Sequence, residues 1–166
     1  MKVVSRKLIE NDYNSMKSLL LSHGRNEWNY ISEENINRQF QHLRENMAQA
    51  ILAEDTEIVG FAILLFQDAC PEKYAKYETL GNIACIGDVV VYKNYSGKGI
   101  GSKLLSESIA LAKRRNISTI FIERHEENLA SAGMMRKAGF EIVETFYDPG
   151  KRHNGSRNTT VQKINP

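Results

Sequence analysis

The most informative pattern in this chain is the stretch Val89-Val90-Val91-Tyr92-Lys93-Asn94-Tyr95-Ser96-Gly97-Lys98-Gly99-Ile100-Gly101-Ser102-Lys103-Leu104-Leu105. An aliphatic run typical of a buried strand leads through a turn with three alternate glycines into a helical pattern. The first amides of a helix have no partner within it, the helix dipole attracts negative charge, and glycine lets a phosphate approach the backbone closely. The stretch therefore predicts an anion site, to which Lys98, Ser102 or Lys103 would add side-chain donors. A plain flexible turn is the alternative.

Two nucleotide-binding motifs do not fit this stretch. The P-loop pattern GxxxxGK[ST] requires a second glycine five residues after the first, but the residue five positions after Gly97 is Ser102. The dinucleotide pattern GxGxxG requires a final glycine where the chain has Ser102 or, in the other register, Leu104. The predicted anion is therefore presented by neither motif.

The length of 166 residues and the hydrophobic share of 42% predict one domain with one ordinary core, residues 1–166. The longest apolar stretch, residues 58–66, is interrupted by Gly60 and is too short to span a bilayer. The amino terminus lacks the apolar core of a secretory signal. We therefore expect a soluble cytoplasmic protein with no membrane partner.

The cysteine and histidine pattern predicts no metal site. Cys70 and Cys85 form no metal motif and are expected to be reduced thiols, and the four histidines are scattered. Charge is distributed unevenly: residues 1–80 carry 9 Lys and Arg against 12 Asp and Glu, whereas residues 81–166 carry 13 against 8. The basic second half favours either a polyanionic ligand or a merely solvated surface.

The hydrophobic spacing and the turn residues predict the order β-α-α-β-β-β-α-β-α-β-β. Helices are expected from about 12 to 24 and over 32–47, 99–115 and 128–139. The expected helix caps are Asn11 or Asp12, Ser32 and Asn128, and the expected helix-ending glycines are Gly24 and Gly139. Strands are expected over 3–9, 49–54, 57–66, 83–92, 118–123, 141–147 and 159–164. Residues 68–82 are expected to form a surface loop. The mixture predicts one mixed sheet with helices on both faces.

Two motifs in this order resemble those of the GNAT acetyltransferase superfamily. Gly99 and Gly101 match the glycines of its [Q/R]-x-x-G-x-[G/A] signature, after an acidic and then aliphatic strand that begins at Asp88. Residues 128–140 resemble its second signature, N-x-x-A-x-x-x-Y-x-K-x-G-F, and the hairpin over residues 50–66 is similar to its second and third strands. The resemblance covers most of the chain.

The resemblance implies an α/β (α+β mixed) single domain, with a central mixed, mostly antiparallel sheet of about seven strands flanked by four helices. Residues 1–47 would supply a strand and the acceptor-side helices, and residues 83–140 the acetyl-CoA-binding core. The implied activity is acetyl transfer from acetyl-CoA, as co-substrate, to the primary amine of a small molecule by direct attack. A protein or peptide acceptor, or a CoA-binding sensor without turnover, remains an alternative.

The same resemblance implies which residues bind acetyl-CoA. The diphosphate would lie on the amides of the glycine-rich turn, and the pantetheine beside the preceding strand, where one N–H would stabilise the oxyanion. The implied cofactor-binding residues are Val89, Val90, Val91, Ser96, Gly97, Lys98, Gly99, Ile100, Gly101, Ser102, Asn128, Ser131 and Met135.

The chain departs from the family pattern at two positions. Ser96 stands where the family has Gln or Arg, which predicts weaker diphosphate binding because only backbone donors remain. Met135 stands where the family has the tyrosine that protonates the leaving sulfur. Tyr92, Tyr147 or Ser131 could replace that tyrosine, and Met135 could equally be core filler. A thiol with a pKa of about 8.5 also leaves tolerably as a thiolate.

The proton acceptor for the attacking amine has two candidates. Asp88 precedes the aliphatic strand segment, and His125 lies between the fifth strand and Asn128. Each could instead be structural, Asp88 at a strand end and His125 in a solvent-facing loop. Cys85 is expected in the core, because direct attack needs no acyl-enzyme.

The acceptor is expected between the two amino-terminal helices and the loop over residues 68–82. Trp28 and Tyr30 could form walls of its pocket, or they could fasten the helices together. The basic segment at residues 151–157 could attract an acidic substrate or could be a solvated arm. No nucleic-acid-binding pattern is present, so no such partner is expected. The resemblance also allows a homodimer.

Overall fold

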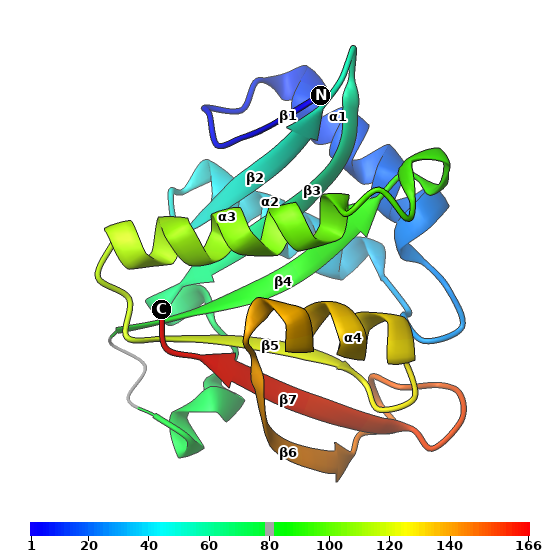
Figure 1. The fold of residues 1–166 in the computed structure, drawn as a ribbon, viewed down its shortest axis with the longest axis vertical. Helices are drawn as coiled ribbons and strands as arrows, with labels where there is room; N and C mark the ends of the chain where they lie inside the picture. The colour runs from blue at the N-terminus through cyan, green and yellow to red at the C-terminus, as the bar shows by residue number, and fades with distance from the viewer. Residues whose placement is uncertain (79–81) are drawn as a thin grey trace.

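The computed structural model describes residues 1–78 and 82–166. Figure 1 shows one twisted sheet in which the strands lie in the order β1-β2-β3-β4-β5-β7-β6. The strands are β1 (Lys2–Val4), β2 (Ala48–Glu54), β3 (Ile58–Phe66), β4 (Ile83–Val91), β5 (Thr119–His125), β6 (Glu141–Tyr147) and β7 (Asn158–Ile164). Every neighbouring pair is antiparallel except β4 and β5, which are parallel. The predicted fold class and element order are confirmed.

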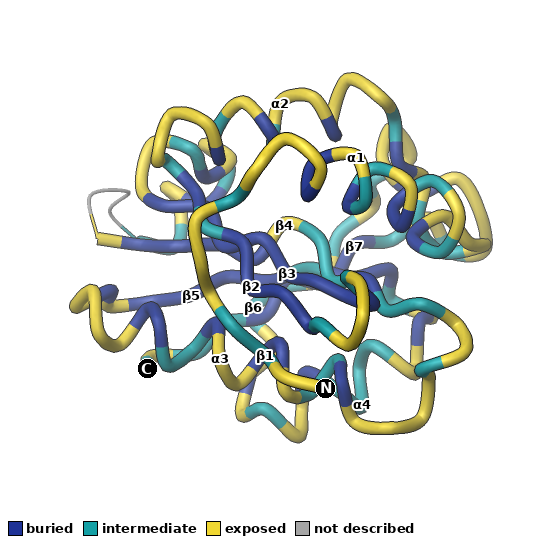
Figure 2. Tube along the Cα trace, turned by 90° about the horizontal axis from the view of Figure 1, so that it is seen from above, coloured by how far each residue is buried: buried dark blue, intermediate teal, exposed yellow. Residues whose placement is uncertain are grey.

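Helices cover both faces of the sheet, as the mixed element order predicted. Figure 2 shows α1 (Glu10–Leu19) and α2 (Glu33–Arg44) on one face, and α3 (Ile100–Arg114) and α4 (Leu129–Ala138) on the other. Each face buries its own apolar cluster because alternate strand residues point to opposite sides. Along β4, Cys85 packs toward α1 and α2 while Ile86 packs toward α3.

The helix ends follow the predicted capping chemistry. The Ser32 hydroxyl accepts a hydrogen bond from the Asn35 amide at 3.1 Å, and the Asn128 side chain accepts one from the Ser131 amide at 3.2 Å. Gly139 ends α4 with φ of 98°, a left-handed conformation that favours glycine. These local signals explain the start of α2 and both ends of α4, whereas α2 ends at Arg44 rather than at residue 47 and α1 ends at Leu19, before a π-helical turn over Leu20–Gly24.

The first strand is shorter than the predicted residues 3–9. Arg6 lies beyond its end and forms ion pairs with Asp12 at 2.7 Å and Glu54 at 2.5 Å. Asp12 is not the helix cap; it lies in the first turn of α1, where it accepts a hydrogen bond from the Ile9 amide at 2.7 Å. The chain therefore leaves the sheet after Val4 because side-chain contacts replace the strand pairing.

The segment after β3 is more ordered than the predicted surface loop. It contains two short 3₁₀ turns, η2 (Gln67–Ala69) and η3 (Glu72–Lys76). Tyr74 is buried and stacks on Phe121, with ring centroids 4.7 Å apart and planes at 5°. This contact anchors the segment against β5. Residues 79–81 of the expected loop lie outside the described residues.

The sheet opens between β4 and β5. Their pairing covers only residues 83–85 opposite residues 119–121, and Figure 1 shows the two strands spreading apart beyond it. A bulge in β4 adds to this divergence, because Gly87 and Asp88 together face the single residue Ile63 of β3. The open edge of β4 runs from Ile86 to Val91.

Candidate functional site

A groove between the start of α3 and α4, called the α3–α4 groove below, occupies about 530 Å³. Most of its lining comes from the glycine-rich turn and from one face of α4. The lining residues are Val91, Tyr95, Ser96, Gly97, Gly99, Ile100, Gly101, Ser102, Leu129, Ala130, Ser131, Gly133, Met134 and Lys137. The structure thus brings much of the predicted cofactor-binding set together.

The glycine-rich turn presents free amides to this groove. Within the described part of the chain, no hydrogen-bond acceptor faces any amide from Gly97 to Ser102. Gly97 and Gly99 have φ of 76° and 75°, and a Cβ added at either would meet nothing within 4 Å. Open space above a row of unpaired N–H groups at a helix start is the geometry that binds a diphosphate.

The open edge of β4 continues from this groove. Val91 lines the groove, while Ile86, Gly87 and Asp88 line a second hollow on the opposite face of the sheet. The edge therefore connects the two hollows, and its main-chain groups remain available to an extended ligand laid beside it like an added strand.

Five of the predicted cofactor-binding residues do not line the groove. Val90 is buried against α1 and α2, and Val89 packs on the α3 side, so only their main chains can face a ligand. Asn128 is buried as the cap of α4. Met135 is 3% exposed within the core, which corrects its assignment as a binding residue; its neighbour Met134 lines the groove instead. Lys98 lies over the Tyr95 ring at 4.9 Å.

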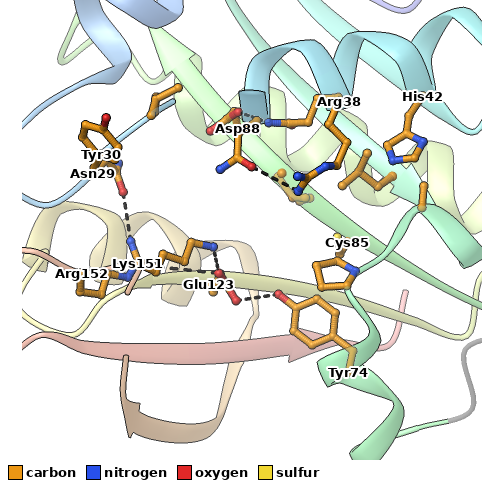
Figure 3. A pocket seen from close by; sticks show the side chains of 18 residues that line it. Asn29, Tyr30, Arg38, His42, Tyr74, Cys85, Asp88, Glu123, Lys151 and Arg152 are labelled. Carbon is orange, nitrogen blue, oxygen red and sulfur yellow. Dashed lines mark hydrogen bonds and ion pairs between the residues drawn. The ribbon is translucent and has the colours of Figure 1, made fainter. Parts of the chain in front are cut away.

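The second hollow, called the acceptor pocket below, occupies about 200 Å³ between α2, the opening of β4 and β5, and the β6–β7 connection. Figure 3 shows its polar side chains pointing inward from opposite walls. Its lining residues are Asn29, Tyr30, Ile31, Asn35, Arg38, Gln39, His42, Leu65, Ala69, Pro71, Tyr74, Cys85, Ile86, Gly87, Asp88, Glu123, Lys151 and Arg152.

Asp88 lies on the bulge of β4 and faces the acceptor pocket. Its Oδ2 accepts a hydrogen bond from Gln39 Nε2 at 2.5 Å. Burial raises the pKa of Asp88, and the Gln39 hydrogen bond and the charge of Lys151 oppose this only in part. A Cβ on Gly87 would lie 2.3 Å from Gln39 Oε1, so this pair depends on glycine at position 87. A carboxylate of raised pKa in a pocket is suited to accepting a proton.

The opposite wall of the pocket is a cluster around Glu123. This carboxylate, whose side chain is 9% exposed, contacts Lys73 Nζ at 2.7 Å and the Tyr74 hydroxyl at 2.9 Å. Lys151 Nζ forms an ion pair with it, and Arg152 Nη2 lies 4.0 Å away. Burial lowers the pKa of Lys151 to about 7, and repulsion from Lys73 and Arg152 contributes.

The segment at residues 151–157 is therefore not simply a solvated arm. Arg152 is 3% exposed, and its Nε donates to Thr159 Oγ1 at 2.8 Å while Nη1 reaches Asn29 Oδ1 at 3.3 Å. Lys151 beside it points into the pocket (Figure 3). The alternative of an acidic substrate at this segment stays a prediction.

His125 is placed differently from the sequence prediction. It is fully buried; its Nε2 lies 2.7 Å from the Asn154 carbonyl, and its Nδ1 accepts from the Glu127 amide at 3.0 Å. Both ring nitrogens are therefore engaged, and Trp28 packs against the ring at 4.7 Å. This placement corrects both interpretations of His125: no lone pair is left to accept a proton from a substrate, and the ring does not face solvent.

The structure also places four other residues that the sequence offered as candidates. Tyr147 is 62% exposed at the end of β6 and lines neither hollow, which corrects its assignment as a proton donor there. Hydrogen bonding with Cys70 and burial raise the pKa of the Cys85 thiol, consistent with a core residue. Tyr30 lines the acceptor pocket, whereas Trp28 instead fastens His125.

Sequence reasoning missed the polar wall that α2 contributes to the acceptor pocket, and one face of α4. Arg38, Gln39 and His42 share a helix face at the spacing i, i+1, i+4, but polar residues on a surface helix normally indicate only solvent exposure. On α4, the spacing of Ala130, Met134 and Lys137 could have indicated the groove face.

Among residues 1–78 and 82–166, no group of three or more potential metal ligands gathers. In the same ranges, no helix has the length and apolarity to span a membrane.

Comparison with known proteins gives consistent similarities. The curated [Ribosomal protein bS18]-alanine N-acetyltransferase of Haemophilus influenzae is 26% identical over 110 residues, which are 66% of this chain and 66% of that relative's length. A Bacillus subtilis acetyltransferase solved with CoA has a TM-score of 0.72 at 18% identity, covering 99% of this chain and 98% of that one. A phosphinothricin acetyltransferase of Sinorhizobium meliloti solved with AcCoA has a TM-score of 0.74 at 18% identity, covering 99% and 89%.

The family model described as acetyltransferase (GNAT) family matches residues 13–140. This range contains α2, the opened β4–β5 junction and the whole α3–α4 groove. The residues that line the groove include both glycines of the family signature, and solved proteins of the same fold carry CoA or AcCoA. The chain belongs to the acetyltransferase (GNAT) family.

Proposed function

We propose that this GNAT acetyltransferase moves the acetyl group of acetyl-CoA onto the primary amine of a small molecule bound in the acceptor pocket. The observation that carries the proposal is the meeting of two hollows along one open strand edge. The amide-rich groove lies at Val91 and Gly97 to Ser102, and the pocket with its half-buried carboxylate lies at Asp88.

The groove fits the diphosphate and the pantetheine of CoA. The unpaired amides from Gly97 to Ser102 would hold the diphosphate, and the Ser102 hydroxyl and Lys137 line the same space. The free main-chain groups of β4 would hold the pantetheine. Ser96 leaves the diphosphate to backbone donors, which the structure provides in an open row.

Asp88 is the residue suited to removing the proton of the amine. An amine attacks a thioester only when it is unprotonated, and a carboxylate whose pKa is raised by burial accepts a proton more readily near neutral pH. Gln39 donates to Oδ2 and holds the carboxylate in the pocket. Met135 is buried and supplies no acid, so the thiol leaves on its own acidity.

A protein amino terminus is a second candidate acceptor. The curated relative in Haemophilus influenzae is named for acetylating an alanine of ribosomal protein bS18. The acceptor pocket, at about 200 Å³, is smaller than the range of roughly 300–1,000 Å³ typical of drug-sized ligands. A pocket of this size accepts a small amine whole, but only the first residue or so of a peptide.

Ser102→Glu tests the placement of the diphosphate. A carboxylate in the first turn of α3 suits the helix dipole and should leave the melting temperature unchanged or higher. It repels the diphosphate, so we expect acetyl-CoA affinity to fall about tenfold or more. Ser106→Glu, one turn further along the exposed face of the same helix, is the matched control and should bind acetyl-CoA like the wild type.

Binding is measured by calorimetry, and turnover by release of free thiol with a panel of small amines and an alanine-initiated peptide. Equal affinity in Ser102→Glu and Ser106→Glu would refute the groove assignment. Binding of acetyl-CoA without thiol release for any amine would identify a sensor rather than an enzyme.

A further inference from the structure

Apart from Arg38 at the rim, which pairs with Glu34, the two walls of the acceptor pocket have opposite electrical character. On the α2 side, Asp88 is a carboxylate and Gln39 Oε1 is a buried acceptor that finds no hydrogen-bond partner among the described residues. His42 Nδ1 is unpartnered in the same part of the structure and also lines the pocket. This wall is equipped to receive a donor such as an amine.

On the other wall, three cationic side chains share the single carboxylate of Glu123. Glu123 is contacted by Lys73 and Lys151 and lies 4.0 Å from Arg152. Arg152 is additionally linked through Thr159 Oγ1 to Asp148, which lies behind the pocket lining. When Lys151 is protonated, Glu123 and Asp148 therefore balance only two of the three cations at this wall.

The whole lining shows the same surplus. Three cations, Arg38, Lys151 and Arg152, face two carboxylates, Asp88 and Glu123. Arg38 at the rim is already shared with Glu34 at 3.2 Å. Arg152 is buried among its partners, whereas the Lys151 side chain keeps 46% of its surface exposed and can turn toward a ligand.

We propose that the acceptor carries an anionic group, such as a carboxylate, beside its amine, with the amine held at Asp88 and Gln39 and the anionic group held by Lys151. This inference rests on the proposed acetyl transfer and names its substrate class. An anion at Lys151 supplies a further counter-charge to the cluster in which Lys73, Lys151 and Arg152 share Glu123, and the amine finds the free acceptor Gln39 Oε1.

The size of the pocket and the position of its charges favour a molecule of amino-acid dimensions. Asp88 and Lys151 line the same pocket from its two walls. An amine and an anion separated by a few bonds would reach both walls within about 200 Å³. A neutral amine would leave the surplus charge at Lys151 uncompensated, which is costly in a partly desolvated site.

The test compares α-amino acids with their own carboxamides, pairs that differ only in the negative charge. The measured quantity is the ratio of kcat/KM for acid over amide, each corrected for the fraction of unprotonated amine. We expect the full-length wild type to prefer the acid about tenfold or more, as for other closely placed charge pairs. Lys151→Met should reduce that ratio toward one, and Lys151→Arg should restore much of it.

Lys113→Met removes an equally charged lysine from the exposed end of α3, outside both hollows, and should keep the wild-type ratio. A wild-type ratio near one, or a preference that survives Lys151→Met, would overturn the inference while acetyl transfer itself stands. Acceptance of an alanine-initiated peptide but of neither member of any pair would overturn it in favour of a protein acceptor. Absence of thiol release with every amine would instead remove the proposed function.

Discussion

Replacement of His125 by alanine separates a structural role from a catalytic one. The ring is fully buried at the end of β5, packs on Trp28 at 4.7 Å and engages both nitrogens, with the Asn154 carbonyl and the Glu127 amide. The change removes all of these interactions while leaving Asp88 and the pocket lining in place. We therefore expect His125→Ala to lower stability with little effect on the chemical step.

The magnitude follows from the contacts that are lost. The two part-buried hydrogen bonds contribute about 0.5–1.5 kcal/mol each, and the emptied space beside Trp28 adds about 2 kcal/mol. A total of about 3–5 kcal/mol is expected, which for a chain of this length lowers the melting temperature by roughly 6–20 °C. His153→Ala, at an exposed histidine of the neighbouring loop, should change the melting temperature far less.

The assay combines thermal unfolding with kinetics measured well below the melting temperature of the variant. A structural histidine predicts a kcat close to that of the wild type under those conditions. A catalytic base predicts a loss of kcat of about 10²–10⁴. An unchanged melting temperature with a hundredfold loss of kcat would refute the structural reasoning and restore His125 as the proton acceptor.

Three further outcomes concern carboxylates and one glycine. Because burial raises the pKa of Asp88, the wild-type kcat/KM should rise with pH over a range above the ordinary carboxyl pKa of about 4. Asp88→Asn should remove this rise, lower kcat about 10²–10⁴-fold and abolish the loss of stability that the wild type shows as pH rises through the pKa of Asp88. A rise of kcat/KM with pH that persists in Asp88→Asn would exclude Asp88 as the proton acceptor. Gly87→Ala should displace Gln39, because Gln39 Oε1 would lie 2.3 Å from the new methyl group, and should reduce kcat/KM about tenfold in steady-state assays. Wild-type kinetics in this variant would show that the contact between Gln39 and Asp88 does not contribute to catalysis. The hydrogen bond from Arg6 lowers the pKa of Asp12, so the ionised carboxylate stabilises the fold above about pH 4 and loses this effect as pH falls through its pKa. Asp12→Asn should therefore lower the melting temperature at pH 7, and the melting temperatures of variant and wild type should approach each other in acid. A difference in melting temperature that does not depend on pH would contradict this reasoning.

Much of the fold could be predicted from local patterns. Ser32 and Asn128 indicated helix starts, and Gly139 a helix end, because capping depends on a few neighbouring residues. The glycine-rich turn indicated an anion site for the same reason: amides at a helix start are unpaired wherever the helix lies. The first strand was overestimated, because the end of β1 depends on Arg6 reaching Glu54, 48 residues away.

The sequence by itself thus determined the element order, the helix ends and the row of amides from Gly97 to Ser102, since each depends on contacts within one turn or one strand. Only the tertiary structure decided the acceptor side. It buried His125, brought Gln39 of α2 onto Asp88, and folded Lys151 back to Glu123, 28 residues earlier in the chain. The charge and the proton affinity of that pocket arise from groups on separate elements, and their distances are set by how the elements pack rather than by any local spacing.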